Sequence, residues 1–390
     1  MCFTPPTTVC HLAVDRTLAS IIAPLTFSAS STESLITPST VLGNIEEVSA
    51  RGLSVMAFCK TITMPGLQDI SRNVRSLSLV LEDIRPSSDD LTVIAQALEA
   101  LTHLEQLTLL GLPFPDSDGL VLRNTSFSLR KFVSDLSLCS KDVLEFLARQ
   151  TCLVELGTTS SLPTAWSRAP IRCQPQYRIL PNELIPDLKV LDCPASLLLS
   201  MLLASPPTRT ITNLRVDLNR ASSLLETDAL VALASFSPTL KRLSLRRDMV
   251  GSGARRSRAM RSMADVLDRI GEKRRWTALK FLELEDGPYD LTSVPALQQS
   301  ISTYFPNIET LVWAPSRPAE HAEASNVLEP EYIASIFFMF CPSLRQFIFS
   351  EPESEDGEKT YTSFSRLRSK DMHPEGILDS AEVENMWRET

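Results

Sequence analysis

The sequence predicts an α/β fold in which a curved parallel sheet carries helices on its outer side, built from about ten irregular repeats. Three observations predict this fold. A short apolar motif recurs along most of the chain, proline or threonine often precedes it at a fixed distance, and helix-type spacing of apolar residues fills the stretches between. A single strand-and-helix unit cannot bury its own apolar face, so such units are expected to stack side by side.

The motif is an apolar residue, two variable residues, a second apolar residue, a variable residue and often a third apolar one. Clear copies are PTLKRLSL at 238–245 and PSLRQFIF at 342–349. The period of two within these copies favours strands over the alternative, an all-helical array. The ten copies begin at residues 74, 104, 129, 153, 188, 211, 240, 279, 308 and 344, with a mean step of 30 residues.

Proline or threonine stands two residues before the first apolar position in seven of the ten copies, as at Thr277 and Pro306. A proline at this place ends the preceding helix, because its ring cannot continue the i to i−4 hydrogen bonds. Helices are therefore expected between the copies, each behind a residue that can cap its first turn. The candidate N-caps are Asp90, Thr227 or Asp228, Ser262 and Ser293.

The repeats divide the chain into three expected parts: an N-terminal cap at 1–70, the repeat domain at 71–350 and an acidic, flexible tail at 351–390. Two loop insertions are expected within the repeats, at 157–187 and at 246–275. The second insertion holds ten basic and four acidic residues, whereas the tail holds 11 acidic and five basic ones. We interpret both charged segments as solvated; the alternative is that the basic segment binds an acidic partner, a nuclear-import receptor or the chain's own tail.

Charge and composition exclude several classes of protein. The 38 basic and 47 acidic residues give a net charge of −9, which argues against a nucleic-acid partner. The longest apolar runs are far shorter than the roughly 20 residues of a membrane span, so no membrane partner is expected. The eight cysteines form no CxxC pair and no secretory signal precedes them. The sequence therefore predicts a reduced intracellular protein, cytoplasmic or nuclear.

Motifs that carry enzyme chemistry are missing from the sequence. It contains neither of the glycine-rich phosphate loops GxxxxGK[ST] and GxGxxG, and neither HExxH nor GxSxG. The four histidines, at 11, 103, 321 and 373, are far apart in the chain. We therefore expect no catalytic residues, no cofactor and no metal site. The alternative is a hydrolase or transferase whose site lies in one of the two insertions.

The repeated motif and its preceding proline or threonine resemble the irregular leucine-rich repeats of fungal F-box proteins, over roughly 74–349. The resemblance implies a leucine-rich-repeat-like solenoid that recognises the substrate protein of a ubiquitin ligase. It also implies an N-terminal F-box that docks onto a cullin-ligase adaptor. Residues 15–27 resemble the end of an F-box, and we interpret them as its remnant. The signature Leu-Pro-x-Glu-Leu that opens an F-box occurs only at 180–184, so a truncated protein that does not dock onto the ligase is the alternative.

Charged side chains mark the surface where a protein partner is expected. Alternate residues of a strand point to opposite faces of the sheet, so the residues between the inward apolar positions line the concave face. On that face two arginine-bearing strands stand beside a glutamate-bearing one, which suits a protein partner. The alternative is that these charges only neutralise one another. The candidate partner-binding residues are Arg215, Asp217, Arg242, Arg246, Phe281, Glu283 and Glu285.

Overall fold

The computed structural model describes residues 46–388, except for the segments 67, 82–85, 113–117, 137, 139, 159–183, 203–209, 220–222, 248–261, 287–292, 316–328, 352–358 and 367–371. The fold is α/β, with mostly parallel strands. The chain divides into two compact units. Unit 1 comprises the residues up to Gln174 together with Glu183–Asp187, and unit 2 comprises Pro175–Asn182 and Leu188–Thr390.

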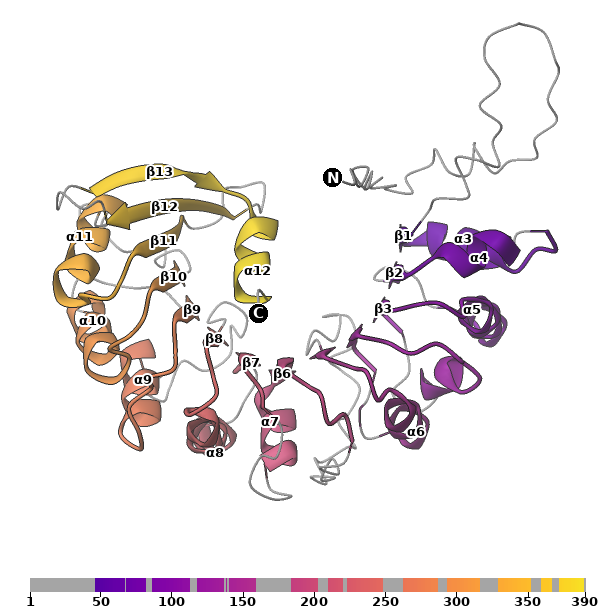
Figure 1. Cartoon of the computed structure of the whole chain (residues 1–390), viewed down its shortest axis with the longest axis horizontal. Helices are drawn as coiled ribbons and strands as arrows, with labels where there is room; N and C mark the ends of the chain where they lie inside the picture. The colour runs from indigo at the N-terminus through magenta and orange to yellow at the C-terminus, as the bar shows by residue number, and fades with distance from the viewer. Residues whose placement is uncertain are drawn as a thin grey trace, which may run out of the picture. The chain divides into compact units, whose positions relative to one another are not determined.

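Unit 1 contains five described strands that pair in parallel in chain order. Its helices lie on one side of this sheet (Figure 1). The strands are β1 (Glu47–Arg51), β2 (Ser76–Val80), β3 (Gln106–Leu110), β4 (Lys131–Ser134) and β5 (Glu155–Thr158). The helices are α3 (Leu53–Ile62), α4 (Gln68–Asn73), α5 (Ser88–Ala100), the 3-10 helix η1 (Asp118–Leu122) and α6 (Lys141–Arg149).

Unit 2 contains six parallel strands followed by two antiparallel ones. The strands are β6 (Val190–Pro194), β7 (Asn213–Asp217), β8 (Arg242–Arg246), β9 (Phe281–Asp286), β10 (Thr310–Pro315), β11 (Gln346–Glu351), β12 (Thr360–Arg366) and β13 (Met372–Leu378). The helices are α7 (Ala195–Leu202), α8 (Ser223–Leu233), the 3-10 helix η2 (Ala234–Phe236), α9 (Met263–Gly271), α10 (Ser293–Tyr304), α11 (Pro330–Phe340) and α12 (Ser380–Arg388). Helices α7–α11 lie on one side of the sheet and α12 lies on the other (Figure 1).

The repeated motif corresponds to the parallel strands of both units. Each of the ten copies is followed, two residues after its first apolar position, by the start of one strand from β2 to β11. The prediction of strands is confirmed, and the all-helical alternative is wrong. Pro306 and Pro342 lie in turns directly after α10 and α11, as expected for residues that end a helix.

The second and third apolar positions of each motif form the core. Leu243 and Leu245 of β8 are fully buried, and the equivalent residues of the neighbouring strands are buried in the same way. Their partners come from the apolar sides of the helices, as where Phe337 of α11 stacks on Phe347 with the ring centroids 5.1 Å apart. Burying each such side chain stabilises the fold by about 1.5–3 kcal/mol before the entropy of ordering is subtracted.

The helix caps agree only in part with the sequence prediction. Ser262 is the N-cap of α9, and its hydroxyl accepts a hydrogen bond from the Asp265 amide while the Asp265 carboxylate accepts one from the Ser262 amide. Asp90 is not the N-cap of α5: Ser87 is, and Asp90 is the reciprocal partner three residues later. The acid is preferred there because it lies in the first turn, close to the unpaired amides. Helix α8 begins at Ser223, before the Thr227 or Asp228 that were expected to cap it.

Three expectations about the chain's organisation differ from the structure. The N-terminal part contains β1, which pairs with β2, so the parallel sheet begins ahead of residue 74. The tail at 351–390 was expected to be flexible, but its described residues include β12 (Thr360–Arg366), β13 (Met372–Leu378) and α12 (Ser380–Arg388). The repeat domain, expected to be one piece, is divided between the two units.

Several predictions fall on residues outside the described part of the chain. These are the F-box-tail remnant at 15–27, residues 159–183 of the 157–187 insertion with all but the last residue of the 180–184 signature, and residues 248–261 of the 246–275 insertion. Within the described part of that insertion, Met263–Gly271 is the helix α9, which connects β8 to β9.

The capping box of α9 can be tested by substitution. Ser262→Ala removes the acceptor for the Asp265 amide and is expected to lower the free energy of unfolding by about 1 kcal/mol. Ser262→Thr keeps the acceptor and is the matched control. Urea denaturation followed by circular dichroism measures both, and equal stability of Ser262→Ala and the wild type would contradict the assignment.

Candidate functional site

The seven candidate residues lie on one face of the unit 2 sheet. We call it the front face: it is formed by the side chains of β6–β11 that alternate with the core residues and point away from α7–α11. The strand register sets which of them are neighbours across the sheet. Ser244 lies between Arg215 and Glu283, and Arg246 lies between Asp217 and Glu285. Arg242 is directly paired with Phe281 on the next strand.

The chain's own C-terminal helix covers part of the front face. After β13 the chain turns at Asp379 and α12 lies on this face (Figure 1). Asp379 and Glu382 form a capping box at the start of α12, in which each carboxylate accepts a hydrogen bond from the other residue's amide. Val383 and Trp387 of α12 are buried against the sheet. The surface expected to bind a partner is thus in contact with another segment of this chain.

A buried arginine is at the centre of the contact. The side chain of Arg215 is 1% exposed, and its guanidinium makes a bidentate pair with Glu384 of α12, with N to O distances of 2.6 and 2.7 Å. The remaining contacts are made within the sheet, to Glu283 at 3.2 Å, Ser244 at 3.2 Å and Asp192 at 3.5 Å. These five contacts match the five N–H donors of a guanidinium, so its position is fixed in three dimensions.

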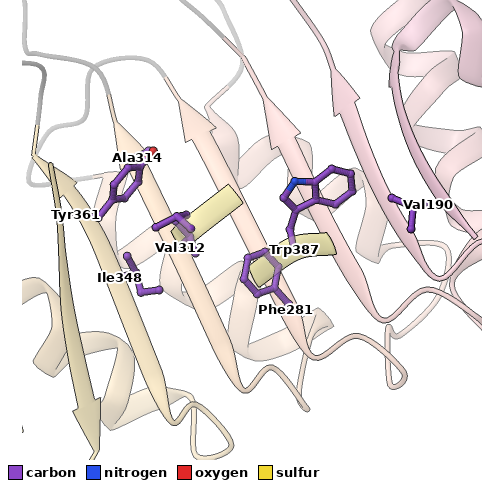
Figure 2. Packing of buried hydrophobic residues seen from close by; sticks show 8 residues of the cluster. Val190, Phe281, Val312, Ala314, Ile348, Tyr361 and Trp387 are labelled. Atoms are coloured by element: carbon purple, nitrogen blue, oxygen red, sulfur yellow. The ribbon is translucent and has the colours of Figure 1, made fainter. Parts of the chain in front are cut away.

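An aromatic side chain fills the space beside this arginine. Trp387 is fully buried, and the Arg215 guanidinium carbon lies 4.1 Å from the centroid of its ring. Figure 2 shows the apolar cluster to which it belongs on the front face. A cation on the face of an indole is favourable by up to about 2 kcal/mol when both groups are desolvated. The cluster comprises Val190, Phe281, Val312, Ala314, Ile348, Tyr361, Val383 and Trp387, with Leu378 and Met386 at its border.

The front face also binds the C-terminal end of α12. The Asn213 amide donates to the Trp387 carbonyl at 2.7 Å, and the Arg242 guanidinium donates to the Met386 carbonyl. The last four carbonyls of a helix have no partner within the helix, and its C-terminus carries a partial negative charge. Asn213 and Arg242 donate hydrogen bonds to these carbonyls, and the positive charge of Arg242 is favourable beside the partial negative charge. Since both side chains contact backbone atoms, they recognise the end of a helix and not particular side chains.

A second charged group lies at the border of the contact. Arg246 pairs with Glu285 at 3.1 Å and with Glu384 at 3.5 Å, and Lys359 also pairs with Glu285. Burial alone would raise the pKa of Glu285, but Arg246 and Lys359 outweigh it and lower that pKa. The glutamate therefore stays ionised at neutral pH and holds the residue before β12 to the sheet.

The charges at the centre are interdependent. Burial would raise the pKa of Glu384, but the hydrogen bonds and charge of Arg215, with Arg388 and Arg246, lower it to about 2. Burial would lower the pKa of Arg215, but the negative charges of Glu283 and Glu384 outweigh burial and raise that pKa above its usual value. For Asp192 burial prevails over the attraction of Arg215 and raises its pKa. The ion pair between α12 and the sheet is therefore formed throughout the physiological pH range.

The residues predicted to bind a partner lie on the sheet side of this contact, and the helix side was not predicted. Arg215, Arg242, Arg246 and Phe281 contact α12 or the apolar cluster. Glu283 pairs with Arg215 inside the sheet, and Glu285 pairs with Arg246 and Lys359. Asp217 is on the same face, where its carboxylate accepts a hydrogen bond from the Asn219 amide. Glu384 and Trp387 were missed. The Asp-x-x-Glu capping box at 379–382 followed by apolar residues at 383, 386 and 387 is the signal that predicts this helix.

The described residues include few groups suited to catalysis. Cys59, Cys193 and Cys341 are buried, and burial raises the pKa of each thiol, to about 12 for Cys59 and about 11 for Cys341. These thiols are protonated at neutral pH and are poor nucleophiles. Within the described ranges, no three His, Cys, Asp or Glu side chains lie together as a metal-binding group. In the same ranges the helices are too short or too polar to cross a membrane.

Comparison of the sequence with known proteins identifies no relative from which a function could be inferred. No protein-family model matches the chain. No curated protein matches its sequence either. The contacts described above are therefore the observations on which a function can be argued.

The ion pair between Arg215 and Glu384 predicts a pH-dependent difference. Glu384→Gln is expected to lower the free energy of unfolding by about 2 kcal/mol at pH 7, because a charge-assisted, bidentate contact is lost. The pKa of Glu384 is depressed in the folded state, so its contribution is complete above the unfolded-state pKa of about 4.5 and is lost as the pH falls towards 2.

Urea denaturation at a series of pH values measures this difference. The gap between the wild type and Glu384→Gln is expected to be constant above about pH 5 and to shrink below it. Glu331→Gln, an exposed residue of α11, is the control and is expected to change stability little at any pH. A gap that stays the same from pH 7 to pH 3 would show that the carboxylate does not pair with Arg215.

The buried indole predicts local opening of α12. Trp387→Ala removes the largest apolar contact of the helix, so the amides of residues 380–388 are expected to exchange with solvent at least tenfold faster. Trp387→Phe is expected to retain most of the protection, because within the described part of the chain the indole N–H has no hydrogen-bond partner to lose. Hydrogen exchange followed by mass spectrometry measures both, and unchanged protection in Trp387→Ala would disprove the anchoring role.

Proposed function

We propose that the chain is a non-enzymatic protein-interaction module, a leucine-rich-repeat-like solenoid whose front face binds a segment of a partner protein. In this function it resembles the substrate-recognition part of F-box/leucine-rich-repeat ubiquitin-ligase receptors. The observation that carries the proposal is the contact between the front face and α12. It combines a bidentate ion pair, a buried tryptophan and hydrogen bonds to the end of a helix, which are means by which proteins recognise peptide segments.

The repeat pattern supports the solenoid part of the proposal. Ten strands follow the motif at a mean step of 30 residues, and those of each unit pair in parallel in chain order. In solenoids each repeat contacts its neighbours, and the exposed sheet face is a continuous surface for a partner. Tryptophan and arginine, both present at the α12 contact, are the residue types that most often dominate binding energy at interfaces.

The free cysteines support a reduced, cytoplasmic or nuclear location. Cys59, Cys152, Cys193 and Cys341 carry free thiols, as is usual for proteins of reducing compartments. The resemblance adds a cullin-ligase adaptor as a second partner. The F-box remnant at 15–27 that would contact it is outside the described part of the chain, so adaptor binding is tested separately below.

Charge reversal on the front face tests the proposal. Affinity purification with the full chain as bait is expected to recover a partner protein, and Arg242→Glu with Arg246→Glu is expected to lower its recovery at least tenfold. Both arginines contact α12 or its carboxylate, so their reversal disrupts the recognition surface. Quantitative mass spectrometry measures recovery, and the same data show whether a cullin adaptor co-purifies.

The matched control reverses two charges away from the front face. Lys273→Glu with Arg275→Glu changes the net charge equally at exposed positions between α9 and β9, and it is expected to leave recovery unchanged. Thermal unfolding confirms that each variant is folded. If a folded front-face variant recovers the same proteins as the wild type, this face does not bind them.

A further inference from the structure

We propose that α12 is a competitor held on the front face in cis, and that the site beneath it binds an amphipathic helix of a partner protein. That helix carries a glutamate, an aromatic residue three positions later and its C-terminal end directly after. The inference rests on the function proposed above and names the class of partner. It follows from three properties of the α12 contact: what the face recognises, how α12 is held, and what lies on its other side.

The face recognises features that any helix of this kind can supply. Arg215 requires one carboxylate, supplied here by Glu384, and the apolar cluster accepts one aromatic ring, supplied by Trp387. Asn213 and Arg242 contact only backbone carbonyls. Among the described residues the Trp387 indole N–H has no acceptor, so this part of the site requires an aromatic ring and no hydrogen bond to it. A separate helix with the same three features satisfies every donor of the site.

The buried charges of this contact would be an inefficient way to stabilise a permanent contact within one chain. A buried cluster of arginine and carboxylates is commonly no more stabilising than apolar residues of the same volume, because each charge must be desolvated. The same cluster discriminates strongly among ligands, since a helix without the carboxylate leaves a buried guanidinium unpaired. A site that selects its occupant is expected to show this composition.

Helix α12 is joined to the rest of the fold by a short connection and by side-chain contacts on one side. It has nine residues, fewer than the roughly 12–15 that an isolated helix needs to be stable in water, so it forms by docking. Ser380, Ala381, Glu382 and Asn385 are exposed on its outer side, and among the described residues no segment packs over them. A single residue, Asp379, separates the helix from β13. Release therefore requires a change at Asp379 and the loss of the front-face contacts, together with the Ser380 hydrogen bond to the Lys359 carbonyl and the packing on Tyr361 and Leu378.

Competition in cis sets how tightly a partner must bind. A helix tethered to its own site acts at a high effective concentration, and the apparent dissociation constant of a ligand in trans rises as the inverse of the fraction of sites that α12 leaves open. Weakening α12 without changing the sheet is therefore expected to tighten binding in trans by about tenfold or more. This increase distinguishes a shared site from a binding site elsewhere.

A labelled peptide tests the proposal with the full chain. The probe is the fluorescein-labelled, C-terminally amidated peptide of residues 379–388, and fluorescence anisotropy measures its binding. The wild type is expected to bind it weakly, whereas the full-chain variant with Glu384→Gln and Trp387→Ala is expected to bind at least tenfold more tightly. Addition of Asn213→Ala and Arg242→Ala to that variant is expected to abolish binding. Circular dichroism and thermal unfolding establish that each variant is folded.

Peptide variants test the recognised features. The peptide with Trp387→Ala or Glu384→Gln is expected to lose binding, and the peptide with Trp387→Phe is expected to retain it. Equal binding to the wild type and the weakened variant, or no binding to a folded weakened variant, would overturn the proposal. So would dimerisation of the wild type through exchanged α12 helices, seen by light scattering, because the occupant would then be a second copy of this chain.

Failure of the inference and failure of the proposed function have different signatures. If the peptide does not bind but charge reversal at Arg242 and Arg246 still removes a partner, the face binds proteins of another kind. If the peptide binds but recovery of no partner depends on those arginines, the site binds only its own helix. The proposed protein-interaction function is then disproved, whereas the recognition of a helix by this site is supported.

Discussion

The buried guanidinium of Arg215 is the constraint on which the front face depends. A cation removed from water must have its donors satisfied, or it costs several kcal/mol. Here the acceptors come from three strands and one helix: Asp192, Ser244 and Glu283 from the sheet, and Glu384 from α12. The strand register sets the positions of the first three. The position of the helix is therefore determined by the sheet, although the two are far apart in sequence.

Much of the sheet was accessible from the sequence because the signals are local. An apolar residue every second position fixes which side of a strand faces the core, and a mean step of 30 residues leaves room for one helix between strands. This reasoning placed strands β2–β11 correctly and put the seven candidate residues on one face of the sheet, whereas their binding of a partner stays a prediction. It also identified Ser262 as a cap. It misplaced the cap of α5 because Ser87 and Asp90 both match, and only geometry distinguishes the cap from its reciprocal partner.

The helix side of the site was not predicted because its partners are remote. The hydrogen bond from Asn213 to Trp387 joins residues 174 positions apart, and nothing in either segment alone indicates the other. Net charge was misleading as well. The acidic surplus of 351–390 suggests a solvated tail, whereas Glu384 is the acid that pairs with a buried arginine. The division into two units was likewise not foreseen, because the motif continues across the boundary between β5 and β6.

The reversal of strand direction after β11 has a consequence for the end of the sheet. A parallel strand at an edge presents unpaired amides and carbonyls on which further chains can polymerise. In unit 2 the edge is β13, an antiparallel strand that contains Pro374, which has no amide hydrogen, and Gly376 at a φ of 153°, beside a register shift between Ser363 and Phe364. Each feature interrupts a regular row of hydrogen-bonding groups. The same segment that delivers α12 to the front face therefore also makes this edge of the sheet a poor template for the addition of another strand.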